Sequence, residues 1–185
     1  AQKNLSKDLS PMTTTFVRYL YGVPFVFIYL AFVKDDIALT DAFGAPRISS
    51  FIIYASLAGA AQIVATYWLI KVLQLRNFAI GTIFAKTEAL QTALLGIVFF
   101  SAFLSMAGWF AIILGVIGIT AISYPDHQQS IDWQSVKYGT LSGLGFGFCA
   151  LWLREASLSL DFSYIQNAAL TLSFTVPLQT AACLL

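Results

Sequence analysis

Long apolar runs separated by short polar segments dominate the chain. A helix that crosses a bilayer needs about 20 consecutive, mainly apolar residues. Six runs meet that requirement, and the short connections between them predict antiparallel neighbours. The expected helices cover residues 12–33, 50–73, 78–101, 105–123, 136–154 and 163–185.

Composition supports a membrane protein. Of the 185 residues, 58% are hydrophobic and 10% are charged, whereas a soluble domain carries about 25% charged residues. A net charge of +1 gives no basic face for nucleic acid. Cys149 and Cys183 both lie in apolar runs, which favours packing over a disulfide. One histidine and two cysteines do not make a metal site, and no cofactor is expected. We therefore predict an all-α integral membrane protein, a polytopic helix bundle.

Part of the first span recurs 153 residues later. At this shift, Asp8 aligns with Asp161, Ser10 with Ser163, and residues 23–24 with the identical pair Val176 and Pro177. Chance can produce a few such matches. A true repeat would contain five spans, so the second copy would enter the membrane from the opposite side, as in many secondary transporters. We expect a first repeat over 1–123, a linker over 124–135 and the start of a second repeat over 136–185.

The ends of the sequence suggest a fragment. Residues 1–10 are polar and lack a signal-peptide pattern, and residues 181–185 lie inside an apolar run. We expect a piece of a ten-span chain that lacks the first span and the C-terminal spans.

Two charges interrupt the third predicted helix. Lys86 and Glu88 point about 200° apart at 100° per residue, so they cannot pair along the helix. Glu88 lies on a stripe of small residues that lets other backbones approach, where it would serve a polar cavity or a structural hydrogen bond. Lys86 either joins the cavity or extends to the interface by snorkelling.

The first predicted helix carries Arg18 and Tyr21 before Pro24. Arg18 lies about 10 Å from the helix start and Glu88 about 16 Å from its own, on the same membrane side. The two could form a structural ion pair or a gate. Pro24, with its counterpart Pro177, would be a hinge or a static bend.

Gln62 and Thr66 share one face of the second predicted helix, with Tyr67 beside them. They would line a cavity or hydrogen-bond neighbouring helices. The fifth predicted helix has small residues at four-residue spacing, which favours helix packing over a phosphate loop. These are Gly139, Gly143 and Gly147.

Three segments resemble the EamA-like branch of the drug/metabolite transporter superfamily. They read LSKDLSPMTTTFVRYLYGVPF, FAIGTIFAKTEALQTALLGIVFF and LSMAGWFAIILGVIGITAIS. The resemblance implies ten spans in two inverted five-span repeats. It also implies transport of small organic solutes. Family members often have a Gly–Glu pair in the turn after the helix that corresponds to residues 78–101. This chain reads Ser101, Ala102 and Phe103 there.

We therefore expect a secondary transporter, an exporter or permease of small metabolites such as amino acids or drugs, working by alternating access. Arg18, Tyr21, Gln62, Tyr67, Lys86 and Glu88 would line or gate the cavity. The expected partners are a small-molecule substrate and the lipid bilayer, with a homodimer left open, in a bacterial cytoplasmic membrane. A non-transporting scaffold or sensor is the first alternative. A membrane-embedded enzyme is the second alternative. We expect no enzymatic activity, because no His/Asp/Glu cluster lies in the spans.

Overall fold

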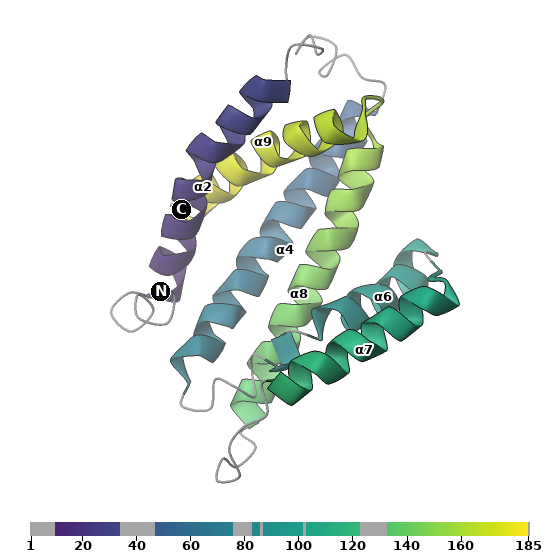
Figure 1. Cartoon of the computed structure of the whole chain (residues 1–185). Coiled ribbons are helices and arrows are strands. Elements are labelled where there is room, and N and C mark those ends of the chain that lie inside the picture. Colours follow the sequence, from purple (N-terminus) through teal and green to yellow (C-terminus); the bar gives the residue numbers. More distant parts are fainter. Residues whose placement is uncertain are drawn as a thin grey trace. The chain divides into compact units, whose positions relative to one another are not determined.

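All the regular elements that the structure describes are helices, as the apolar runs predict. The computed structural model describes residues 10–33, 47–75, 83–85, 87–101, 103–122 and 133–184. The helices, in chain order, are α2 (Pro11–Val33), α4 (Ile48–Gln74), α6 (Glu88–Phe100), α7 (Met106–Ile122), α8 (Trp133–Leu158) and α9 (Tyr164–Ala182) (Figure 1). The prediction of an all-α helix bundle is confirmed, with most boundaries displaced by one to four residues.

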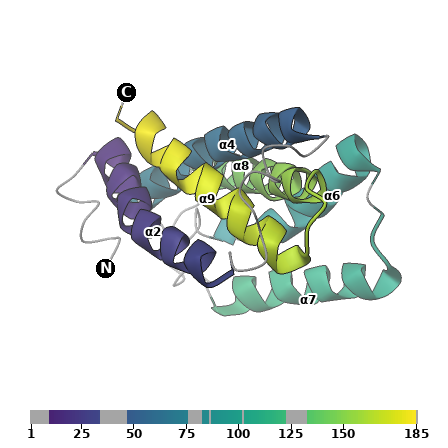
Figure 2. The same cartoon turned by 90° about the horizontal axis from the view of Figure 1, so that it is seen from above.

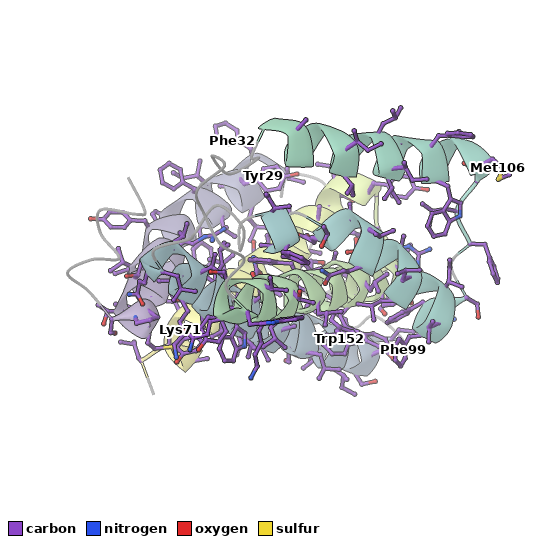
Figure 3. The ribbon with its side chains drawn as sticks, turned by 90° about the horizontal axis from the view of Figure 1, so that it is seen from below. Tyr29, Phe32, Lys71, Phe99, Met106 and Trp152 are labelled. Atoms are coloured by element: carbon purple, nitrogen blue, oxygen red, sulfur yellow. The ribbon has the colours of Figure 1, made fainter. Side chains whose placement is uncertain are left out.

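Among the described residues, three segments are long and apolar enough to cross a membrane: α2, α4 and the segment Ile83–Phe100. Helix α7 contains the shorter apolar stretch Met106–Gly118. Large apolar side chains on these helices are exposed, including Phe32 at 82% and Met106 at 78% (Figure 3). Such surfaces suit lipid rather than water. That α8 and α9 also span the membrane stays a prediction.

The third predicted helix is locally irregular. Its described parts are residues 83–85 and α6, and Lys86 between them lies outside the described residues. The Thr87 amide donates to the Ile83 carbonyl at 3.1 Å, and the Gln91 amide donates to the Thr87 carbonyl at 3.0 Å. The hydrogen-bond pattern thus continues through Thr87. Glu88 is the first residue of α6, and Thr87 before it has φ −71° and ψ 5°.

The described fold separates into two units. One consists of Ala1–Thr14 with Val64–Phe148, and the other of Thr15–Ile63 with Cys149–Leu185. Helices α4 and α8 therefore each contribute part of their length to each unit.

In the first unit, glycines on α8 allow close packing on two sides. A Cβ added at Gly147 would lie 3.0 Å from the Thr92 Oγ1 of α6, and one at Gly143 would lie 2.8 Å from the Gln91 Nε2. A Cβ at Gly145 would lie 2.9 Å from the Ala65 Cβ of α4. The stripe of Gly143 and Gly147 faces α6, and Gly145 brings α8 against α4.

A buried hydrogen bond reinforces the α4–α8 contact in this unit. The Ser142 hydroxyl of α8 donates to the Ala65 carbonyl of α4 at 3.0 Å. Further along the same two helices, the rings of Trp68 and Tyr138 lie 5.0 Å apart. Close backbone approach leaves room for this polar contact, which apolar packing alone does not provide.

In the second unit, α4, α8 and α9 share an apolar core. Its buried members are Phe51, Ala55, Ala156, Leu160 and Leu170. The rings of Phe51 and Phe174 lie 5.5 Å apart, and Leu30 of α2 packs against the cluster. Helix α2 lies beside α9 (Figure 2). A Cβ added at Gly22 of α2 would lie 3.5 Å from the Val176 Cγ1 of α9.

Helix α6 ends in a left-handed residue. Ser101 has φ 50° and ψ 29°, and its amide donates to the Gly96 carbonyl. A residue with a Cβ pays about 1–2 kcal/mol in this conformation, which glycine avoids. The serine stands where the resemblance leads one to expect glycine, so this turn is strained.

Replacing Gly145 by alanine should destabilise the protein relative to the same replacement at Gly115. Both variants gain helix propensity of up to about 1 kcal/mol. Only the Cβ at position 145 would meet Ala65, whereas nothing lies within 4 Å of one at Gly115. We expect Gly145→Ala to be less stable than Gly115→Ala by about 1–3 kcal/mol, measured by thermal unfolding in detergent. Equal stability of the two variants would show that the α4–α8 contact is looser than described.

Ser101→Gly should stabilise the chain by about 0.5–1 kcal/mol, because relief of the left-handed strain exceeds the added freedom of the unfolded chain. Ser101→Ala keeps a Cβ and serves as the control, with no gain expected. Thermal unfolding of both variants tests this, and a gain in the alanine variant would trace the effect to the lost hydroxyl.

Candidate functional site

A pair of glutamines joins α4 to α9 in the second unit. The Gln179 Nε2 donates to the Gln62 Oε1 at 2.6 Å and lies 3.4 Å from the Gly59 carbonyl oxygen. Gln179 is only 1% exposed, and a Cβ at Gly59 would come within 3.5 Å of its Cγ. Its Oε1 is buried and finds no hydrogen-bond partner within the described part of the chain. The pair therefore offers one vacant acceptor inside the helix bundle.

Gln179 ends a buried polar stripe on α9. The stripe repeats every fourth residue, which places its members on one helix face: Asn167, Thr171, Thr175 and Gln179. The threonine hydroxyls donate to carbonyls one turn earlier, at 2.7 Å for Thr171 and 2.8 Å for Thr175. Such local bonds satisfy short hydroxyls, whereas the longer glutamine reaches another helix.

Asn167, at the other end of the stripe, fastens the turn between α8 and α9. Its Nδ2 donates to the Leu160 carbonyl at 3.0 Å and to the Phe162 carbonyl at 3.2 Å. Beside it, Ser163 and Gln166 form a capping box that starts α9. These bonds set where α9 begins, and hence the depth at which Gln179 lies.

A second polar group lies at the start of α6 in the first unit. The Gln91 Nε2 donates to the Thr87 Oγ1 at 2.9 Å, and the Thr87 Oγ1 donates to the Phe84 carbonyl at 2.6 Å. The Gln91 Oε1 is buried without a partner among the described residues. Glu88, partly buried, occupies the first turn of the same helix. A carboxylate is favoured there because the helix N-terminus carries partial positive charge.

Tyr67, predicted for the cavity, belongs to an aromatic cluster around Lys71. The Lys71 Nζ lies 5.0 Å from the centre of the Tyr67 ring, 5.6 Å from that of Trp68 and 5.8 Å from that of Tyr138. A cation over several aromatic faces is attracted by each of them. The cluster joins the end of α4 to α8, and aromatic rings with a lysine are typical of a helix end at the membrane interface.

The remaining predicted residues are placed as follows. Arg18 and Tyr21 are exposed on α2. Pro24 and Pro177 lie inside α2 and α9, and both helices continue through them. Arg18 belongs to the second unit and Glu88 to the first, so their pairing stays a prediction, as do the hinge roles.

Three buried amide residues are not among the predicted site residues, although the sequence contains a signal for each: Gln179, Asn167 and Gln91. In α9 the polar residues repeat at exact four-residue intervals within an apolar run, which marks one inward face. Gln91 follows Thr87 by four residues, the spacing that allows a side-chain hydrogen bond on a helix. Among the described residues, the buried side-chain atoms without a hydrogen-bond partner belong to these three amides.

A known protein family matches about two thirds of the chain. The model described as "EamA-like transporter family" matches residues 1–124 of the 185. The matched region contains α2, α4, α6 and α7, together with Gln62 and Glu88. Searches of curated proteins and of solved structures gave no significant match.

The Gln62–Gln179 bond should appear as non-additive stability. Gln62→Leu leaves a buried amide without its acceptor and should cost about 1–2 kcal/mol. Gln179→Leu should cost a similar amount, and the double variant less than the two together by about 0.5–1.5 kcal/mol. Thermal unfolding of the four proteins measures this coupling. Strict additivity would mean that the two amides do not interact.

Proposed function

Because the chain belongs to the EamA-like transporter family, we propose that it is part of a secondary transporter that moves small organic metabolites by alternating access. Amino acids and drug-like compounds are the proposed substrates. The helices α2 and α4 and the segment Ile83–Phe100 are long and apolar enough to place it in a membrane, and we assign that membrane to the bacterial cytoplasmic membrane. Transport is a binding and conformational task, so no chemical catalysis is assigned to its residues.

The hydrogen bond between Gln62 and Gln179 carries the proposal. Gln62 lies in the proposed first repeat, residues 1–123, and Gln179 in the proposed second repeat, residues 136–185. Transporters of this kind bind substrate between their repeats near the bilayer midplane. Gln62 is the fifteenth residue of α4, which has 27 residues, so it lies close to the middle of that helix. The Gln179 Oε1, which has no hydrogen-bond partner among the described residues, would accept a hydrogen bond from substrate.

The equivalence of α2 and α9 supports the inverted repeat. The Ser10 Oγ accepts from the Thr13 amide at 3.1 Å, and the Ser163 Oγ accepts from the Gln166 amide at 3.4 Å. Each serine precedes the helix proline by 14 residues. Residues near a two-fold axis contact their own equivalents. At the 153-residue shift the equivalent of Gly22 is position 175, and Gly22 lies against the next residue, Val176. We propose that Pro24 and Pro177 act as paired hinges in the transition.

Glu88 is the proposed coupling residue. It is partly buried at the start of α6, one turn from the unpaired Gln91 Oε1. A carboxyl group in such surroundings can exchange its proton for substrate during the cycle. Arg18, Tyr21, Tyr67 and Lys86 complete the proposed set of lining or gating residues.

Glu88→Gln in the full-length protein should remove the pH dependence of substrate uptake into proteoliposomes, because the amide cannot titrate. The substrate would first be chosen by thermal stabilisation across a metabolite panel. The matched control is Asp161→Asn, which changes an exposed acid between α8 and α9 and should leave uptake intact. Wild-type uptake and pH profile in Glu88→Gln would exclude Glu88 from the mechanism.

A further inference from the structure

A polar pocket lies between the beginning of α4 and the end of α8, within the second unit. Its volume is about 370 Å³, and polar atoms form most of its wall. The lining residues are Arg47, Ser50, Tyr54, Glu155, Leu158 and Ser159. Phe51 and Ala156, the chain neighbours of Ser50 and Glu155, belong to the buried apolar core.

The two walls carry opposite charge. Arg47 directly precedes α4, whose N-terminus adds roughly half a positive elementary charge. Glu155 lies in the last turn of α8 and Ser159 directly follows that helix, whose C-terminus carries a similar partial negative charge. Side-chain charge and helix dipole thus agree in sign on each wall. Such a pocket matches a ligand whose anionic and cationic groups lie a few ångströms apart.

Both charged side chains have capacity for a ligand. The Arg154 Nη1 donates to the Glu155 Oε1 at 2.7 Å, which leaves the Glu155 Oε2 for a second donor. The Arg47 guanidinium makes no ion pair with any described residue. A bidentate guanidinium suits a phosphate or carboxylate group.

The depth of the pocket points to lipid. Helix α4 has 27 residues and is therefore about 40 Å long, whereas the hydrocarbon layer is about 30 Å thick. Its first turn, with Arg47 and Ser50 beside it, extends into the headgroup layer. Ser50, Tyr54 and Leu57 share one face of α4, and Leu57 is 40% exposed. An acyl chain could leave the pocket along this face.

We propose that this pocket binds the phosphoethanolamine headgroup of a membrane phospholipid. The phosphate lies against Arg47 and the N-terminus of α4. The primary ammonium donates to the Glu155 Oε2. A choline headgroup lacks N–H donors, and a glycerol headgroup lacks the cation, so the site distinguishes ethanolamine from both.

Native mass spectrometry of the delipidated full-length protein tests the proposal. Dioleoyl phosphatidylethanolamine, phosphatidylcholine and phosphatidylglycerol would each be added in mixed micelles. We expect the wild type to bind the ethanolamine lipid about tenfold more tightly than the other two, from charge-assisted hydrogen bonds to the ammonium. Glu155→Gln should abolish this preference, and Arg47→Gln should weaken ethanolamine-lipid binding about tenfold. Lys137→Gln, which changes an exposed cation elsewhere on α8, should change neither.

Several outcomes would overturn the proposal. Equal retention of the three lipids by the wild type is one, and an undiminished ethanolamine preference in Glu155→Gln is another. Soluble phosphoethanolamine that binds as tightly as the lipid would assign the pocket to a free zwitterion. If either glutamine variant fails to fold, Arg47→Lys and Glu155→Asp keep the charges and should retain most of the preference. Loss of the preference in these conservative variants, with the fold retained, would contradict the assigned contacts.

Discussion

Lipid cannot hydrogen-bond, and this constraint shapes the rest of the structure. Each backbone polar group in a span must find its partner inside the helix, and each polar side chain must find one within the protein. The threonines of α9 solve this locally by donating to carbonyls one turn earlier. Gln179 cannot do so, and it reaches Gln62 on another helix. The amide pair therefore ties two helices together at the cost of a vacant buried acceptor.

Close backbone approach is the second requirement, and small residues on α8 provide it. Without a hydrophobic driving force between helices, contact depends on packing and on interhelical hydrogen bonds. Gly143 and Gly147 admit side chains of α6, while Gly145 admits Ala65 of α4. The hydrogen bond from Ser142 to the Ala65 carbonyl forms where that approach is closest. The same helix thus contacts two others through alternate residues.

Much of the fold was predictable because span length and hydropathy are local properties. The six helices and the proline within α2 follow from short stretches of sequence. The candidate site was predicted less well. Glu88 and Gln62 attracted attention as polar residues in apolar runs, but nothing local distinguishes a glutamine that pairs across helices from one that does not. Gln179 was therefore not predicted. Within the described residues, the helix expected over 78–101 is interrupted at Thr87.

The sequence by itself determined which segments are helical, which of them suit a membrane, and which family the chain resembles, because lipid selects long apolar helices regardless of their neighbours. Only the tertiary structure decided which polar groups meet. The pairing of Gln62 with Gln179 joins residues 117 positions apart, and the pocket of Arg47 and Glu155 brings two helix ends together. Such contacts depend on helix rotation and register, which packing of small residues sets and which no single span encodes.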